Sequence, residues 1–215
     1  MGASGPTVTY RLAIFDFDGT LADSLPWFAE IYDQLASEFG LRRVDRAERE
    51  VLRARHAREV LAQVGIAAWQ LPRIAHRLRR LKAQQATRIP LFPGVGDLLR
   101  DLATRGIGRA IVSSDAEANI RATLGPDQSA LIEIWDCGAG LFGKSAKLRR
   151  VVRRSGVPAA AALYVGDELR DAEAARAAGI GFGAVAWGYS TPDALRAQAP
   201  DRLFTSIAEI APAFG

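Results

Sequence analysis

Six side chains of this sequence could together carry out metal-assisted chemistry. They are four carboxylates, one hydroxyl and one ammonium group, and each comes soon after an apolar run or a glycine-rich loop: Asp16, Asp18, Asp167, Asp171, Ser113 and Lys144. Hard oxygen ligands favour Mg²⁺, which neutralises the repulsion between carboxylates and a phosphate. An ionised aspartate beside a metal can attack phosphorus and form an aspartyl-phosphate. The residue types therefore indicate phosphoryl transfer.

The apolar runs in front of these residues predict the strands that position them. Short apolar runs alternate with segments of helical periodicity along most of the chain: Tyr10–Phe15, Ile107–Val112, Leu131–Trp135, Ala160–Val165, Gly181–Trp187 and Arg202–Thr205. This alternation predicts parallel strands joined by right-handed crossovers, an α/β doubly wound sheet. Ligands of such sheets bind at the carboxyl ends of the strands. We therefore expect the six side chains to lie at one edge of the sheet.

A helical insert interrupts this alternation after the first strand. Apolar residues recur at spacings of three and four from Trp27 to Phe39, and Gly40 is a plausible stop. A second helix is expected to end near Gly65, and a third to cover Leu71 to Leu81. The predicted organisation is a core domain of residues 1–22 and 89–215 and a helical cap domain of residues 23–88.

Four motifs in a fixed order give the chain a resemblance to a known family. They are Asp16-Phe17-Asp18-Gly19-Thr20-Leu21, Ile111-Val112-Ser113-Ser114, Lys144, and Gly166-Asp167-Glu168-Leu169-Arg170-Asp171. From about Arg11 to Trp187 the chain resembles the haloacid dehalogenase (HAD) superfamily. The insert is similar to the cap of the subgroup that contains phosphoglycolate phosphatase and β-phosphoglucomutase. The resemblance implies a Rossmann-like core with a small all-helical cap.

The resemblance also implies a role for each aspartate. Asp16 is similar to the nucleophile, and Asp18 to the general acid that protonates the leaving alcohol and then activates water as a base. Mg²⁺ is the implied cofactor, bound by Asp16, Asp167 and the backbone carbonyl of Asp18. Thr20 and Asp171 are expected to support these ligands.

The remaining motif residues are expected to bind the phosphoryl group. Ser113 resembles the hydroxyl that donates to the phosphoryl oxygens, together with backbone amides near Phe17, Asp18 and Ser114. Lys144 resembles the lysine that balances charge between nucleophile and phosphate.

Three alternatives stay open at the level of sequence. Lys147, one helical turn beyond Lys144, could take the lysine's place. Glu168 could assist the metal instead of Asp171, or Asp171 could be only a first-turn acid favoured by the helix dipole. The segment 138–143 matches G-x-G-x-x-G, but it falls in a late strand–helix unit and is interpreted as a phosphate-side loop rather than a dinucleotide site.

The favoured function is hydrolysis of a small phosphate monoester, resembling phosphoglycolate or a sugar phosphate. Dehalogenase members of the family lack an acid two residues after the nucleophile, so Asp18 argues for phosphate chemistry. A phosphomutase of the same fold is an alternative. A non-catalytic protein that binds anions or nucleic acid through the arginine-rich insert is another, although a nucleic-acid partner is disfavoured.

Composition sets outer bounds on these readings. Net charge is +4, and no apolar stretch is long enough to span a bilayer. Cys137 is the only cysteine, which makes a reducing compartment, and hence a cytoplasmic location, the expectation. No membrane partner is expected, and the sequence carries no signal for an oligomeric state.

Overall fold

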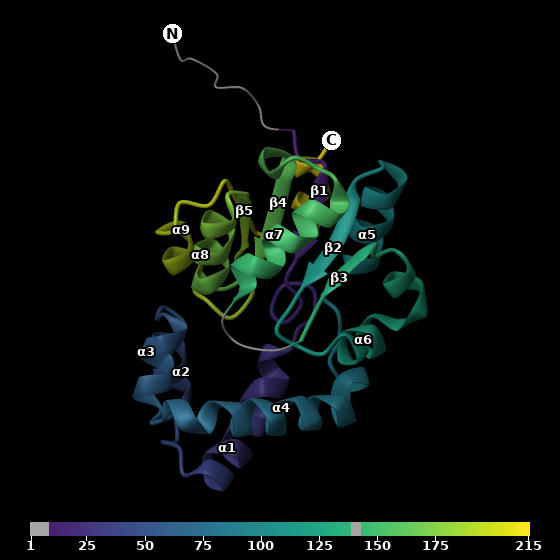
Figure 1. Ribbon diagram of the computed structural model, residues 1–215. Coiled ribbons are helices and arrows are strands. Elements are labelled where there is room, and N and C mark those ends of the chain that lie inside the picture. Colours follow the sequence, from purple (N-terminus) through teal and green to yellow (C-terminus); the bar gives the residue numbers. More distant parts are fainter. Residues whose placement is uncertain (1–8, 139–142) are drawn as a thin grey trace.

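The computed structural model describes residues 9–138 and 143–215, which contain one parallel β-sheet (Figure 1). Within these residues the sheet has six strands in the order β3-β2-β1-β4-β5-β6. Their bounds are β1 Leu12–Phe15, β2 Gly108–Val112, β3 Ile134–Asp136, β4 Ala162–Gly166, β5 Gly181–Val185 and β6 Arg202–Phe204. Every neighbouring pair is parallel. The doubly wound α/β fold predicted from the sequence is confirmed.

Helices cover both faces of the sheet, because the central strands are apolar on both sides. One apolar cluster joins Phe15 and Ile111 to α5 (Val95–Thr104) and α6 (Glu117–Ala130). The other face packs against α7, α8 and α9, which are Lys144–Ser155, Leu169–Ala178 and Pro192–Arg196. Residues of β1 and β4 are buried along their whole length. The sheet therefore forms a rigid base for residues at the strand ends.

The insert between β1 and β2 is helical, as its periodicity predicts. Its helices are α1 Leu25–Phe39, α2 Arg46–Leu52, α3 Ala57–Gln63 and α4 Leu71–Gln85. Gly40 ends α1 in a left-handed conformation at φ 67°, and its amide donates to the carbonyl of Ala36. Figure 1 shows these helices gathered beyond the carboxyl edge of the sheet.

The chain enters and leaves the insert through two adjacent segments. The amide of Asp23 donates to the carbonyl of Pro90 at 2.9 Å, and Ala22 forms an antiparallel bridge with Leu91. This pairing supports, as a proposal, the division into a core of residues 1–22 and 89–215 and a cap of residues 23–88.

Two predicted elements were wrong in detail. The expected second helix of the insert is two helices, α2 and α3, and the strand expected at Leu131–Trp135 is β3, which begins at Ile134. The later start follows because α6 consists of two helical segments, which are separated by a non-helical break at Gly125, where φ is 76°, and the second segment ends only at Ala130.

The chain ends differ from prediction as well. The C-terminal helix expected after β6 is two short 3₁₀ turns, at Ile207–Glu209 and Ala211–Ala213, and α9 had no counterpart among the predicted elements. None of the described helices has the length and apolar character needed to cross a membrane.

Candidate active site

The sheet register brings the predicted carboxylates to one edge. Phe15 of β1 is level with Ile111 of β2 and Val165 of β4, so the residues that follow these strands emerge side by side. Asp16 continues β1, and its amide donates to the carbonyl of Val165 at 2.9 Å. Its carboxylate belongs to a buried group of three, in which one oxygen of each carboxylate lies within 4.8 Å of one oxygen of each of the others: Asp16, Asp167 and Asp171. This carboxylate group is the centre of the site.

Lys144 places its ammonium group within this cluster from the first turn of α7. Its Nζ lies 2.6 Å from Asp16 Oδ2 and 2.6 Å from Asp171 Oδ1. Lys147, the alternative lysine, lies elsewhere and donates to the backbone carbonyl of Ser113 at 2.9 Å. Of the two lysines, the structure thus brings Lys144 to the carboxylates, whereas Lys147 holds the segment after β2.

Asp167 is held by neutral donors only. Its Oδ1 accepts a hydrogen bond from Thr20 Oγ1 at 2.8 Å, and its Oδ2 accepts one from the amide of Tyr189 at 2.7 Å. Among residues 9–138 and 143–215, no lysine or arginine forms an ion pair with Asp167. The predicted contact of Thr20 is therefore a hydrogen bond to this carboxylate.

Asp171 lies in the first turn of α8 and faces the cluster. It accepts hydrogen bonds from the amides of Asp167 at 3.2 Å and Glu168 at 3.0 Å, besides its ion pair with Lys144. The side chain of Glu168, the alternative acid, is ion-paired with Arg170 instead. Asp171 is therefore both an acid in the first turn of a helix and a member of the carboxylate group.

Asp18 lies apart from the three clustered carboxylates and contacts the insert. Lys82, near the end of α4, forms an ion pair with Asp18 and a second one with Asp115, at 2.7 Å from its Oδ2. The Lys82 side chain is only 5% exposed, and its Nζ lies 5.6 Å from the ring centroid of Phe17. A buried cation of the insert is thus attached to the motif that contains Asp16.

Sequence reasoning missed Lys82 and Asp115. In α4 the buried side chains are Ile74, Leu81 and Lys82, so this lysine occupies a position eight residues after Ile74, on the apolar face. A lysine in an apolar stripe was the available signal. Asp115 had none, because its significance depends on a helix distant in the sequence.

The predicted phosphate-binding residues surround the same strand ends. The amide of Phe17 donates to Asp16 Oδ1 at 2.8 Å, and Ser113 Oγ, in a side chain that is almost fully buried, accepts from the amide of Asp115 at 3.1 Å. Ser114 continues the chain between them. Residues 139–142, the middle of the glycine motif that precedes Lys144, lie outside the described residues.

Comparison with known proteins identifies the family. The family model described as "Haloacid dehalogenase-like hydrolase" matches residues 13–185. The chain belongs to this family.

Relatives of this hydrolase include named phosphatases. It is similar to the phosphoglycolate phosphatase of Synechococcus elongatus, with 37% identity over 198 residues, which cover 92% of this chain and 93% of that protein. It is also similar to the phosphoglycolate phosphatase of Xanthomonas campestris pv. campestris, with 33% identity over 190 residues, 85% of this chain and 86% of the other.

Solved structures share the fold of the hydrolase. A putative phosphoglycolate phosphatase from Lactobacillus plantarum superposes with a TM-score of 0.82 at 22% identity, covering 96% of this chain and 100% of that one. CbbY from Rhodobacter sphaeroides, in complex with phosphate, superposes with a TM-score of 0.73 at 23% identity, covering 94% and 96%. At these identities the likeness concerns the fold.

The positive charge near the hydrolase's carboxylate group is too small to keep the pKa of every carboxyl at its ordinary value. Burial raises the pKa of Asp16 to about 7 although Lys144 opposes the shift. Burial also raises the pKa of Asp167 well above its ordinary value, and the charges of Glu168 and Asp171 add to the rise. For Asp171 the effect of burial is outweighed by Lys144 and by Arg170, so its pKa is lowered.

Lys144 alone does not neutralise this group. Burial opposes its charge, but Asp16 and Asp171 raise its pKa, so it stays protonated and pairs with both of them. Asp167 is left with two neutral donors and a raised pKa. The three buried carboxylates form a set of hard oxygen donors, and a single lysine does not balance their charge. This set therefore fits a metal ion.

Removal of divalent cations is expected to destabilise the hydrolase increasingly as the pH rises. The Asp16 pKa is about 7 in the folded chain and 3.8 as the ordinary value, so between these values the folded state holds a proton that the unfolded state has lost. Stability from this group is complete below about pH 4 and is lost as the pH rises through about 7. We expect the Tm difference between Mg²⁺ and EDTA to be about 3 °C or more larger at pH 7.5 than at pH 5.0.

Asp16→Asn is the matched variant for this measurement, because it removes the titrating group and retains the side-chain volume. Its Tm should depend less on pH in EDTA than that of the parent chain. Equal melting temperatures with Mg²⁺ and EDTA at pH 7.5 would contradict the metal site.

Proposed function

We propose that this hydrolase is a Mg²⁺-dependent phosphatase that cleaves a small phosphate monoester through an aspartyl-phosphate on Asp16. The observation that carries the proposal is the position of Asp16, at the end of β1, in a buried carboxylate group and 2.6 Å from Lys144. Two relatives, at 37% and 33% identity, are named phosphoglycolate phosphatase, which supports hydrolysis of a phosphate monoester as the reaction class. The proposed substrate class is phosphoglycolate-like or sugar-phosphate monoesters.

Asp16, Asp167 and Asp171 would hold the Mg²⁺, with the backbone carbonyl of Asp18 as the further ligand expected from the family motif. When bound, the ion supplies the positive charge that lets a phosphate dianion approach buried carboxylates. The three acidic side chains and their burial support this assignment.

Asp16 is the proposed nucleophile, and its neighbours fix its orientation. The amide of Phe17 donates to Oδ1 and Lys144 donates to Oδ2, so both carboxylate oxygens have a defined direction. Attack forms a bond from a carboxylate oxygen to phosphorus, and the ester bond to the leaving oxygen breaks. Lys144 stabilises the ionised nucleophile at neutral pH, where burial alone would favour its protonated form.

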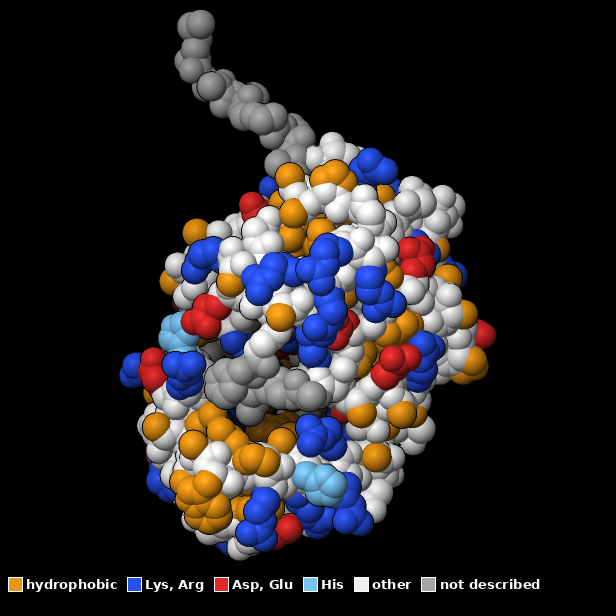
Figure 2. All heavy atoms as spheres, in the orientation of Figure 1, with side chains coloured by type: hydrophobic (Ala, Val, Ile, Leu, Met, Phe, Trp, Pro, Cys, Tyr) orange, Lys and Arg blue, Asp and Glu red, His pale blue; other side chains and the backbone are white. Residues whose placement is uncertain are grey.

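Asp18 is the proposed proton donor and acceptor. It gives its proton to the leaving alcohol in the first step and takes one from water in the second, when hydrolysis of the aspartyl-phosphate restores Asp16. Its ion pair with the buried Lys82 holds the ionised form, which is the proton acceptor of the second step, at the side of the site that faces the insert, and the proton gained there is the one donated in the next turnover. That is the side on which a leaving group would lie, between core and cap; Figure 2 shows a hollow between the two parts.

The transferred phosphoryl group would be bound by donors after β1 and β2. Ser113, the amides near Phe17, Asp18 and Ser114, and Lys144 are the proposed donors. Hydrogen bonds hold the segment after β2 in place: Lys147 donates to the carbonyl of Ser113, and Asn119 donates to Asp115 Oδ1 at 2.9 Å.

The arginines of the insert favour a small anionic substrate over nucleic acid. Several of them form ion pairs with acids of the insert itself: Arg42 with Glu48, Arg49 with Asp33, Arg55 with Glu59 and Arg77 with Glu38. Their charge is therefore partly compensated at the surface, and exposed pairs of this kind are screened by salt. Among the described residues of the insert, Lys82 instead pairs with the motif residue Asp18.

Asp16→Asn is expected to lower kcat/KM for 2-phosphoglycolate at least about 10³-fold, because the amide is a far weaker nucleophile. Activity of the parent chain should disappear in EDTA and return with Mg²⁺. Asp193→Asn is the control, since its side chain is 93% exposed on α9 and forms an ion pair with Arg196. Phosphatase activity that survives EDTA or Asp16→Asn would contradict the proposal.

Lys82→Met is expected to slow hydrolysis to an extent that depends on the leaving group of the substrate. Because Lys82 positions the proposed general acid, kcat/KM for 2-phosphoglycolate, whose alkoxide leaving group needs a proton, should fall roughly 10²-fold. For p-nitrophenyl phosphate, whose leaving group departs without a proton, the fall should be less than about tenfold.

Arg80→Met is the matched control for this variant, because Arg80 is exposed on the same helix. It should leave both substrates unaffected. If Lys82→Met lowered kcat/KM equally for both substrates, Lys82 would act on a step other than proton donation to the leaving group.

A further inference from the structure

One arginine of the insert is attached to the loop that follows β5. Arg53, at the end of α2, donates from Nη2 to the carbonyl of Gly188 at 2.9 Å and from Nε to the carbonyl of Tyr189 at 3.0 Å. Its own carbonyl accepts from the amide of Thr191 at 3.1 Å. The planar guanidinium thus bridges two successive carbonyls, an arrangement that suits arginine and not lysine.

The same loop holds Asp167 from its other side. The amide of Tyr189 donates to Asp167 Oδ2 at 2.7 Å, and the amide of Ser190 donates to the Asp167 carbonyl at 3.1 Å. The approach is close, because a Cβ added at Gly188 would lie 2.2 Å from the Cβ of Asp167. The loop backbone therefore lies directly between Arg53 and this carboxylate.

A single peptide unit makes both of the decisive contacts. The carbonyl of Gly188 and the amide of Tyr189 belong to one planar group, so a rotation that breaks one hydrogen bond displaces the other. A charged donor on the carbonyl also polarises the peptide and strengthens its N–H as a donor. The chain of contacts runs from Arg53 through this peptide to Asp167 Oδ2.

The Tyr189 side chain adds a second attachment to the insert. Its hydroxyl lies 3.1 Å from Ser24 Oγ, next to the start of α1, and its ring meets Phe28 edge-on with centroids 6.2 Å apart. The loop is therefore attached both to the start of α1 and to the end of α2.

We propose that Arg53 is a positioning residue that couples docking of the cap to binding of the divalent cation at Asp167. This inference rests on the proposed metal site. With Arg53 in place, the Gly188–Tyr189 peptide fixes the carboxylate of Asp167 in the orientation found in the cluster. When the cap moves away, the peptide loses its restraint, and Asp167 loses the partner of Oδ2.

The coupling is reciprocal. If cap docking raises the affinity for the cation, the bound cation must favour the docked cap by the same factor. The enzyme would then close more readily once its metal site is filled. Partners of metal-ligating carboxylates contribute about 10–100-fold to metal affinity, which sets the size of the expected effect.

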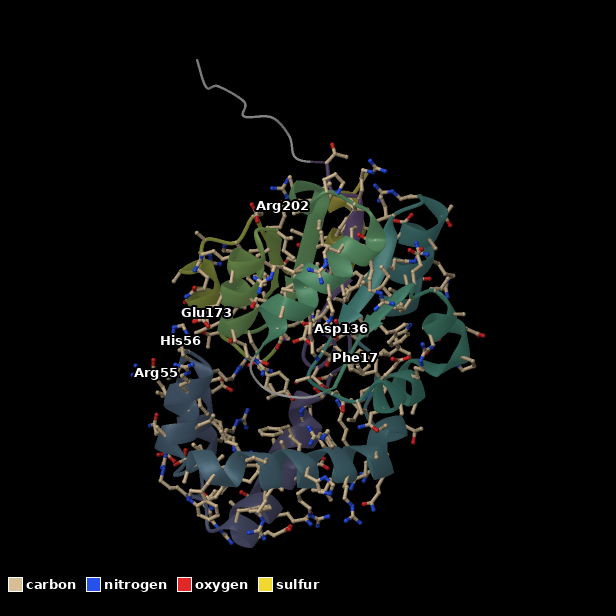
Figure 3. The ribbon with its side chains drawn as sticks, viewed as in Figure 1. Phe17, Arg55, His56, Asp136, Glu173 and Arg202 are labelled. Atoms are coloured by element: carbon tan, nitrogen blue, oxygen red, sulfur yellow. The ribbon has the colours of Figure 1, made fainter. Side chains whose placement is uncertain are left out.

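A second contact between insert and core provides the matched control. His56 Nδ1 lies 3.0 Å from Glu173 Oε1 on α8, and Figure 3 shows the two side chains facing one another across the boundary. This pair does not include the loop of residues 188–191. His56→Ala therefore removes a docking contact without altering the peptide that holds Asp167.

The test is calorimetric titration of Mg²⁺ into the full chain after EDTA treatment and dialysis. We expect Arg53→Ala to weaken Mg²⁺ binding about tenfold and Arg53→Lys to weaken it less, because one ammonium group bonds one carbonyl at a time. His56→Ala retains the contacts of Arg53 with the loop, so it should weaken Mg²⁺ binding clearly less than Arg53→Ala does. Hydrogen exchange in residues 46–63 should slow on addition of Mg²⁺ in the parent chain and in His56→Ala, but not in Arg53→Ala.

Three outcomes would overturn the inference. Mg²⁺ binding by Arg53→Ala within about twofold of the parent value would show that Arg53 only attaches the cap. If His56→Ala weakened Mg²⁺ binding as much as Arg53→Ala does, docking of the cap would affect the metal site by a route other than the loop of residues 188–191. If Arg53→Ala does not fold, unchanged Mg²⁺ binding by Arg53→Lys decides against the coupling. Absence of Mg²⁺ binding in the parent chain would instead refute the proposed metal site itself.

Discussion

Repulsion among buried carboxylates is the constraint on which the rest of this structure depends. Asp16, Asp167 and Asp171 are almost fully excluded from solvent; the charge of Asp171 raises the pKa of Asp16 and of Asp167, and the charge of Asp16 raises the pKa of Asp167. Burial of a charge is costly unless it is paired and hydrogen-bonded. The structure meets this requirement in part, with Lys144 between two carboxylates and neutral donors on the third. The charge that remains uncompensated is the physical basis for a metal site.

The sheet makes this concentration of charge possible. Strands β1, β2 and β4 are adjacent and in register, and helices on both faces cover their apolar side chains. A rigid, fully packed base can hold side chains in an arrangement that repulsion would otherwise disperse. The cost of gathering the carboxylates is thus met by apolar burial elsewhere in the core.

Much of the site could be predicted because its parts are local in the sequence. Asp16, Ser113 and Asp167 each follow an apolar run, and parallel strands bring such positions together whatever the loops do. The HAD-like family and the doubly wound sheet follow from this pattern and are confirmed. The roles of the individual side chains stay predictions, supported by where the structure places them.

The contacts of the insert could not be predicted, because they depend on tertiary structure. Lys82 lies 64 residues from Asp18 and Arg53 lies 135 residues from Gly188, and neither pair leaves a local pattern. The start of β3 was misplaced for a different reason. The helix does break at Gly125, as the sequence indicates, but a further helical segment follows the break and ends only at Ala130.

The most direct test of the account is a crystal of the protein soaked with Mn²⁺ as an anomalous scatterer in place of Mg²⁺. The account predicts one strong anomalous peak at the carboxyl edge of the sheet, coordinated by oxygens of Asp16 and Asp167. A peak at another place, or Asp16 and Asp167 oriented so that they do not share one ion, would contradict it.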